Sequence, residues 1–187
     1  MHHTPVLLAE VLDALGIVSA GVYIDCTVGE GGHTEAILNA DSGCRVLGLD
    51  RDTSALATAR TRLAPFGGRA TLANASYALM VEQAKEHRLF PGDGVLMDLG
   101  ISSLQLAEEG RGFSFQRDDP LDMRFGPEGE TLAEDVVNHY SERALVTILQ
   151  DFGEEPRARR VAKAIVRSRP LRTTGELAKV VEEVLGR

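Results

Sequence analysis

The sequence predicts an α/β protein in which a doubly wound parallel sheet of four strands is followed by a smaller, mostly helical lobe. Strand and helix signals alternate through the first hundred residues, and this alternation is typical of a parallel sheet with helices on both faces. After Gly100 comes a stretch without sustained periodicity, followed by four helical segments. We therefore expect two domains, at residues 1–101 and 102–187.

The elements of the first domain follow from hydrophobic spacing and turn residues. Apolar residues at helical spacing predict a helix over residues 6–15, with Pro5 suited to its first turn. Asp52 is expected to cap the helix that ends near Leu63. The other elements of this domain are expected as strands at 22–26, 45–49, 70–73 and 94–98 and as helices at 32–40 and 77–87.

The second lobe is predicted from helical periodicity, and Ser141 is expected to cap one of its helices. Four strands are few for the fold class, so the strand at 94–98 should form an exposed edge of the sheet. That edge is expected to be covered by the helical lobe, by further chain or by a partner, or else to allow self-association. The four helices are expected at 131–139, 141–152, 156–167 and 174–185.

A glycine-rich turn follows the first predicted strand. Residues 25–33 read Asp-Cys-Thr-Val-Gly-Glu-Gly-Gly-His, and glycines let a backbone approach a ligand where a Cβ would clash. Thr34 stands where the dinucleotide fingerprint, begun at Gly29, requires its last glycine. The turn also carries the acids Asp25 and Glu30, which disfavour a pyrophosphate. These features favour a cationic ligand with an adenosine end, and S-adenosylmethionine, a sulfonium, fits that description.

Two further carboxylates stand at predicted strand ends. Asp50 comes about twenty residues after the turn, near the spacing of a ribose-binding acid, and Asp98 ends the fourth strand. In an open α/β sheet, ligands bind outside the carboxyl ends of the strands, so both should converge with the turn on one crevice. The alternatives remain a solvated strand end for Asp50, a turn cap for Asp98 and a packing role for His33.

The bulk composition narrows the function classes. No apolar run is long enough to cross a bilayer, and the N-terminus lacks the pattern of a signal peptide. Cys26 and Cys44 form no metal or redox spacing, so we expect no metal, reduced thiols and a cytoplasmic protein.

Charge is unevenly distributed along the chain. The formal net charge is −8, yet residues 157–172 contain seven basic residues and no acidic one. Such a cationic stripe on an acidic protein indicates either phosphate binding or a solvated helix face. The seven residues are Arg157, Arg159, Arg160, Lys163, Arg167, Arg169 and Arg172.

Together, these segments resemble the bacterial 16S rRNA (cytosine-N(4))-methyltransferases of the RsmH/MraW type. The resemblance runs in order through the whole chain, and its most specific parts are Arg-Gly-Phe-Ser-Phe at 111–115 and Pro-Leu-Asp-Met-Arg at 120–124. The other matching segments are 3–8, 25–33, 49–52, 98–105 and 153–155.

The resemblance implies a class I methyltransferase, Rossmann-like fold, here with its first four strands and a helical lobe. It also implies S-adenosylmethionine-dependent methylation of the exocyclic amine of a cytidine in small-subunit ribosomal RNA. The first domain would bind S-adenosylmethionine and the second would recognise the substrate. The expected cofactor-binding residues are Gly29, Gly31, Gly32, His33, Asp50, Tyr77, Asp98 and Gln105.

Catalytic and RNA-binding roles also follow. Asp98 is the candidate proton acceptor and Asp122 a second possibility. Phe113 and Phe115 either belong to the core of the second lobe or include a ring that stacks on a flipped base. Family members continue well beyond residue 187, so the alternative function is a truncated, catalytically silent domain that binds S-adenosylmethionine or RNA. The expected RNA-binding residues are Arg157, Arg160, Lys163 and Arg167.

Overall fold

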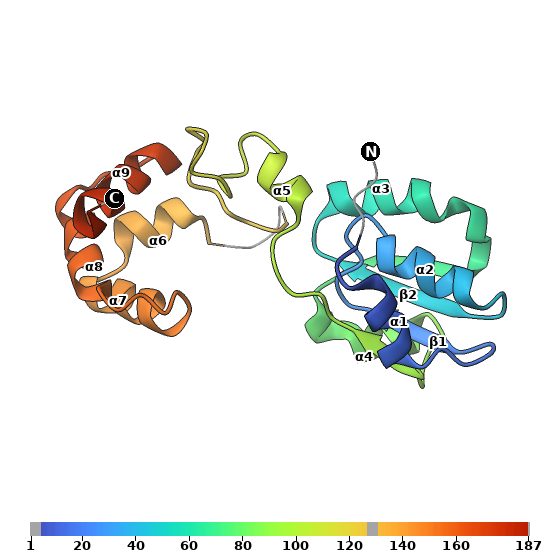
Figure 1. The fold of residues 1–187 in the computed structure, drawn as a ribbon. Coiled ribbons are helices and arrows are strands. Elements are labelled where there is room, and N and C mark those ends of the chain that lie inside the picture. Colours follow the sequence, from blue (N-terminus) through green and yellow to red (C-terminus); the bar gives the residue numbers. More distant parts are fainter. Residues whose placement is uncertain (1–4, 127–130, 187) are drawn as a thin grey trace. The chain divides into compact units, whose positions relative to one another are not determined.

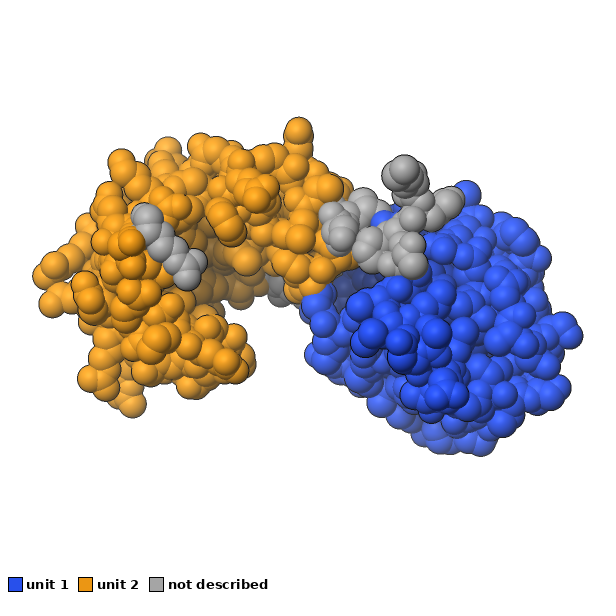
Figure 2. Space-filling view, viewed as in Figure 1, with its two compact units in different colours: residues 1–100 blue, residues 101–187 orange. Residues whose placement is uncertain are grey.

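The computed structural model describes residues 5–126 and 131–186, except for the side chains of residues 103 and 104 (Figure 1). The chain forms two compact units, Met1–Gly100 and Ile101–Arg187, which are coloured separately in Figure 2.

The first unit is built on a parallel sheet with the strand order β3-β2-β1-β4. This order places the first strand in the middle, as in doubly wound nucleotide-binding folds, and confirms the predicted α/β class. The strands are β1 (Val22–Asp25), β2 (Arg45–Asp50), β3 (Ala70–Asn74) and β4 (Gly94–Leu96).

Helices pack against the sheet, and the alternation of side chains along β1 divides the core. Tyr23 belongs to a cluster with residues of α2 and α3, and Leu12 and Leu15 of α1 pack against that cluster. Val22 and Ile24 belong to a second cluster that includes Ala84 of α4. The helices are α1 (Leu8–Leu15), α2 (Gly32–Ala40), α3 (Thr53–Leu63) and α4 (Met80–Glu86), with short 3-10 helices η1 (Ala64–Arg69) and η2 (Tyr77–Leu79).

Three predicted boundaries in this unit were wrong. The first helix starts at Leu8 and excludes Pro5, because Leu7 adopts a left-handed conformation with φ of 50°. The segment predicted as one helix at 77–87 splits into η2 and α4. Strand β4 ends at Leu96, since the N–H of Asp98 donates to the side chain of Thr27 and so leaves the ladder.

The second unit is mostly helical, as predicted. Its core comprises Leu121 with apolar residues of α6 to α9. The short helix α5 was not predicted, because it spans only five residues. The irregular chain between α5 and α6 is joined to the start of α9 by an isolated bridge between Pro120 and Thr173. The helices are α5 (Ser103–Ala107), α6 (Ala133–His139), α7 (Glu142–Asp151), α8 (Ala158–Arg167) and α9 (Thr174–Leu185).

Both predicted helix caps are confirmed. The Asp52 carboxylate accepts hydrogen bonds from the first turn of α3, and the Ser141 hydroxyl accepts one from Ala144 N at the start of α7. Across the part of the chain that the structure describes, each helix is too short or too polar to span a membrane.

Candidate functional site

Hydrogen bonds join the chain at the carboxyl ends of three strands of the first unit. Directly after β1, the N–H of Gly29 donates to Asp50 Oδ2 on β2 at 2.9 Å. The hydroxyl oxygen of Thr27 accepts the N–H of Asp98, beyond β4, at 2.7 Å. The turn is therefore bound on both sides, and the structure brings together Gly29, Asp50 and Asp98.

Asp50 is the central carboxylate of this edge. Its Oδ1 accepts the N–H of Asp52 at 2.9 Å, so each carboxylate oxygen already accepts one backbone N–H. Partial burial raises the pKa of Asp50 above its usual value, an effect that these hydrogen bonds offset only in part. The backbone of Arg51 is a further partner, and because an ionised carboxylate has about four lone-pair sites, it keeps acceptor capacity for a ligand's hydroxyl group.

The three glycines of the turn have different structural roles. Gly29 has a left-handed backbone with φ of +50°, and a Cβ there would meet nothing closer than 3.9 Å. A Cβ at Gly31 would lie 3.1 Å from Leu63, and one at Gly32 would collide with Pro5. Gly31 and Gly32 thus allow the start of α2 to pack closely, whereas Gly29 leaves open space beside the strand ends.

The side chain of His33 is turned into the protein. It is 8 % exposed, and its Nε2 lies 3.0 Å from the carbonyl oxygen of Val6. The imidazole therefore holds the segment that precedes α1 against the start of α2. A contact between His33 and a cofactor remains a prediction, and it would have to come from the backbone.

Asp25, which the sequence suggested as part of an acidic ligand-facing turn, lies inside the protein. It is 1 % exposed, and burial raises its pKa from 3.8 to about 6. Its oxygens accept hydrogen bonds from the hydroxyl of Thr34 at 2.7 Å and from the N–H of Thr27 at 3.2 Å. The carboxyl thus connects the turn to α2, and Glu30 is the acid in the turn that is partly exposed.

Thr27 is a positioning residue that the sequence analysis missed. Its N–H donates to Asp25 and its hydroxyl oxygen accepts from Asp98, so one side chain connects β1 to the segment after β4. The sequence did offer a sign of this role, because Thr27 is a hydroxyl residue directly after the first predicted strand, where its side chain can accept a backbone N–H from a neighbouring strand end.

Tyr77 follows the end of β3 on the other side of Asp50. The carbonyl of Asp50 accepts hydrogen bonds from Asn74 Nδ2 at 2.9 Å and from Ala75 N at 3.1 Å, which hold the two strand ends together. Tyr77 begins η2 two residues later and is 47 % exposed, so its ring is available to a ligand. Asp98 is also exposed.

Gln105 belongs to the second unit and caps a helix there. Its Oε1 accepts the N–H of Ser102 at 2.9 Å, while its own N–H donates to the Ser102 hydroxyl at 3.1 Å. This reciprocal arrangement is a capping box, and it leaves Gln105 only 7 % exposed.

Asp122 is also in the second unit, and its carboxylate is bound by an arginine. Arg124 donates to both carboxylate oxygens at 2.8 Å in a bidentate pair. These hydrogen bonds hold the pKa of Asp122 below its usual value. Asp122 is therefore a poor proton acceptor at neutral pH.

The basic segment divides into two groups of residues. Arg157 donates to the carbonyl of Leu185 at 3.1 Å and lies near Glu155, so it supports the fold of the second unit. In contrast, four cations of α8 are exposed and form no ion pair with any residue that the structure describes: Arg159, Arg160, Lys163 and Arg167.

The described residues contain no cluster of three or more histidine, cysteine, aspartate or glutamate side chains suited to a metal ion. Cys26 and Cys44 are buried free thiols. Burial raises the pKa of Cys26 to about 11, so this thiol is a weak nucleophile.

Comparison with known proteins places these features in a family. Ribosomal RNA small subunit methyltransferase H of Dehalococcoides mccartyi is 45 % identical over 98 % of this chain and 53 % of the relative. The corresponding enzymes of Koribacter versatilis and Thermotoga neapolitana are 47 % and 44 % identical over 96 % and 98 % of this chain, and 59 % and 62 % of theirs. The chain thus spans between half and two thirds of the length of these relatives.

A solved rRNA methylase from Streptococcus thermophilus shows a partial likeness, with a TM-score of 0.36 and 18 % identity over 44 % of this chain and 49 % of that one. The profile of the MraW methylase family, by contrast, matches residues 1–187, which include both the bonded strand ends and the irregular segments of the second unit. The chain therefore belongs to the MraW methylase family.

Proposed function

We propose that this chain serves the S-adenosylmethionine-dependent methylation of the exocyclic amine of a cytidine in small-subunit ribosomal RNA, a cytoplasmic reaction. The observation that carries the proposal is the bonded edge at which Gly29, Asp50 and Asp98 meet. The names of the relatives support small-subunit ribosomal RNA as the substrate class.

The residues at this edge fit S-adenosylmethionine. The remaining lone pairs of Asp50 would accept the ribose hydroxyls, and the exposed ring of Tyr77 would pack on the adenine. The open space beside Gly29 leaves room for the rest of the cofactor. The bound sulfonium would supply an activated methyl group, so the protein's own task is alignment of the acceptor nitrogen and exclusion of water.

Asp98 is the proposed proton acceptor. The lone pair of the cytosine amine is delocalised into the ring, so a carboxylate that accepts its proton favours attack by nitrogen. The backbone of Asp98 is held by Thr27 while its side chain is exposed, which leaves the carboxylate accessible. The bidentate pair with Arg124 argues against Asp122 in this role.

The exposed face of α8 is the proposed RNA-binding surface. Arg160, Lys163 and Arg167 recur at helical spacing on the face opposite the buried residues of α8. Exposed cations in such a row can neutralise successive phosphates. We infer that Arg159 contributes in place of Arg157, which supports the fold.

A second candidate is a domain that binds cofactor or RNA without turnover. The observation that favours it is that β4 is an edge strand of the described sheet. Beside that edge, Val95, Met97 and Leu99 are exposed, so self-association through it is part of this alternative.

Methyl transfer from labelled S-adenosylmethionine to undermethylated small subunits tests the proposal. The chain and its Asp98→Asn variant would be assayed beside Asp13→Asn, a control at an exposed position of α1. Turnover by the unaltered chain and by Asp13→Asn, together with its loss in Asp98→Asn, would support the proposed methyltransferase activity. If the unaltered chain binds S-adenosylmethionine but transfers no methyl group, the silent domain is favoured. If it binds neither S-adenosylmethionine nor RNA, both candidates are overturned.

A further inference from the structure

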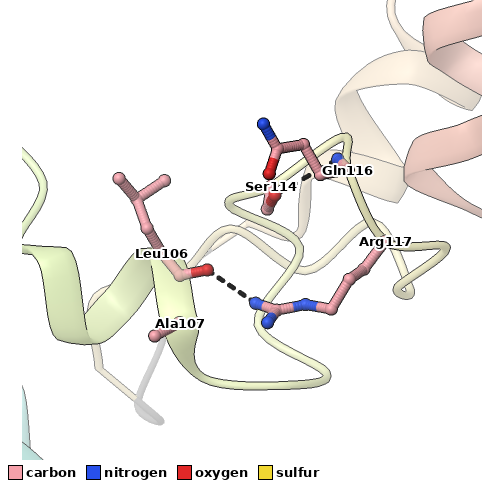
Figure 3. Close-up of a pocket in the computed structure, with 5 residues that line it drawn as sticks. All are labelled: Leu106, Ala107, Ser114, Gln116 and Arg117. Atoms are coloured by element: carbon pink, nitrogen blue, oxygen red, sulfur yellow. Dashed lines mark hydrogen bonds between the residues drawn. The ribbon is translucent and has the colours of Figure 1, made fainter.

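The second unit contains a pocket that the proposed site does not use. It lies between the end of α5 and the loop at residues 114–117 (Figure 3), and its volume is about 400 Å³. This volume falls within the range of small-ligand sites. The lining residues are Leu106, Ala107, Ser114, Gln116 and Arg117.

One wall of the pocket is held in place by Arg117. Its Nη2 donates across the pocket to the carbonyl of Leu106 at 2.6 Å, as Figure 3 shows. The hydroxyl of Thr174 donates to the carbonyl of Arg117 at 2.7 Å. The nearby carboxylate of Asp119, 3.8 Å from the guanidinium, compensates its charge. The wall is thus preorganised and suits a neutral group better than a phosphate.

The loop at residues 114–117, three of whose residues line the pocket, carries two side-chain groups that the fold does not use. The N–H of Gln116 donates to the Ser114 hydroxyl at 3.2 Å, which shapes a tight turn with Phe115 at its tip. Phe115 is 74 % exposed. Within residues 5–126 and 131–186, the amide of the Gln116 side chain makes no hydrogen bond.

The neighbouring aromatic residue behaves differently. The ring of Phe113 packs 5.3 Å from that of Phe125 and lies under the guanidinium of Arg111. Of the two rings in the segment 111–115, one is therefore part of the structure and the other is presented to solvent.

We propose that this pocket receives an unpaired base of the RNA, with the ring of Phe115 stacked on the base and the Gln116 amide paired with its edge. Aromatic stacking and side-chain pairing with base edges are how proteins recognise single-stranded RNA. A glutamine amide is both donor and acceptor, so it can match the amino and ring-nitrogen groups of a base. The inference rests on the proposed RNA substrate and adds a base-recognition site to it.

Ultraviolet crosslinking tests the inference in the complete chain. The probe is a short, cytidine-rich, single-stranded oligoribonucleotide, and trypsin releases residues 112–117 as one peptide because Arg111 and Arg117 flank it. We expect the crosslink in this peptide. Phe115→Leu should weaken binding roughly fivefold or more, because the stacking of one base is removed, and should leave the salt dependence unchanged.

Matched variants make the result specific. Gln116→Ala provides a second change in the same loop, while Phe90→Leu alters an exposed residue, and Gln83→Ala a half-buried residue, of the same types in the first unit. The two controls should bind as the unaltered chain does. Thermal unfolding of each variant verifies that it is folded.

Two results would overturn the inference, and they are distinguishable. In the first, RNA binding depends on the cations of α8, but the RNA does not crosslink to residues 112–117 and its affinity is unchanged by the Phe115 and Gln116 substitutions. The pocket is then not a base site, and the proposed function stands. If neither the oligoribonucleotide nor small-subunit RNA binds the chain, the proposed function fails and the base site fails with it.

Discussion

The two units hold their candidate functional segments with different sets of side chains: carboxylates do so in both units, and in the second unit arginines do so as well. At the sheet edge of the first unit, carboxylates accept backbone N–H groups, as Asp50 does from Gly29. In the irregular parts of the second unit, arginines donate to backbone carbonyls, as Arg111 does to Phe125 and Arg169 to Val137. Buried backbone groups need partners, and chain without a ladder takes them from side chains. A basic residue in the second unit is therefore not evidence of an RNA contact until its partners are known.

The largest expected effect concerns the buried carboxyl of the first unit. Because the pKa of Asp25 is raised to about 6, the protonated carboxyl favours folding below about pH 3.8, and this stability is lost as the pH rises through 6. Asp25→Asn stays neutral, so its stability relative to the unaltered chain should rise by about 2.4 kcal/mol between pH 4 and pH 7. Urea unfolding across that range measures the difference, and parallel curves for the two proteins would contradict the burial argument.

A second change removes the central carboxylate. Asp50→Ala should weaken S-adenosylmethionine binding by about 2 kcal/mol, because charge-assisted hydrogen bonds to the ribose are removed. Calorimetry with S-adenosylmethionine and with NAD measures the loss and the preference, with Asp13→Ala as the control. Unchanged affinity in the variant, or tight binding of NAD, would refute the role of Asp50.

The arginines allow a direct test of this difference between the units. Arg169 donates to the carbonyls of Val137 and Tyr140, so Arg169→Ala should lower the free energy of unfolding by about 2 kcal/mol. Arg160→Ala, on the exposed face of α8, should change it by less than about 0.5 kcal/mol. Equal losses in the two variants would remove the distinction between structural and exposed arginines.

A smaller effect is expected at Thr27. Thr27→Ala should cost about 1 kcal/mol of stability by leaving the N–H of Asp98 without its partner, whereas Thr27→Ser keeps the hydroxyl and should cost less. If Asp98 acts as proposed, Thr27→Ala should lower kcat more than it raises KM for the RNA, and serine should rescue kcat. Loss of stability alone, with kinetics unchanged, would limit Thr27 to a structural role.

The last expected change is in a salt dependence, which is measured as a slope and not as a loss of stability. Reversing the charges of Arg160, Lys163 and Arg167 together should flatten the plot of log affinity for RNA against log salt concentration. For each phosphate that the protein no longer neutralises, the slope should fall by about 0.7 to 0.9. The same slope in the triple variant and the unaltered chain would identify the α8 cations as a solvated face.

Particular residues show which features of the structure could be predicted from the sequence. The caps at Asp52 and Ser141 were predictable because each acts within one turn of its own helix. The meeting of Gly29, Asp50 and Asp98 was predictable because parallel strands end at the same edge of a sheet. The burial of Asp25 was not, since its partner Thr34 gives no sign in the sequence that its hydroxyl points inward.

The sequence by itself determined the parallel α/β class, the order of the elements and the strand ends at which chemistry gathers, because these depend on periodicity and on local turn residues. Tertiary structure decided which polar side chains remain available to ligands. It placed His33 and Asp25 inside the protein and assigned Arg157 to a helix end, while it left Phe115 in solvent. The physical reason is that each buried polar group needs a partner, and these partners come from chain segments that the sequence does not reveal as neighbours.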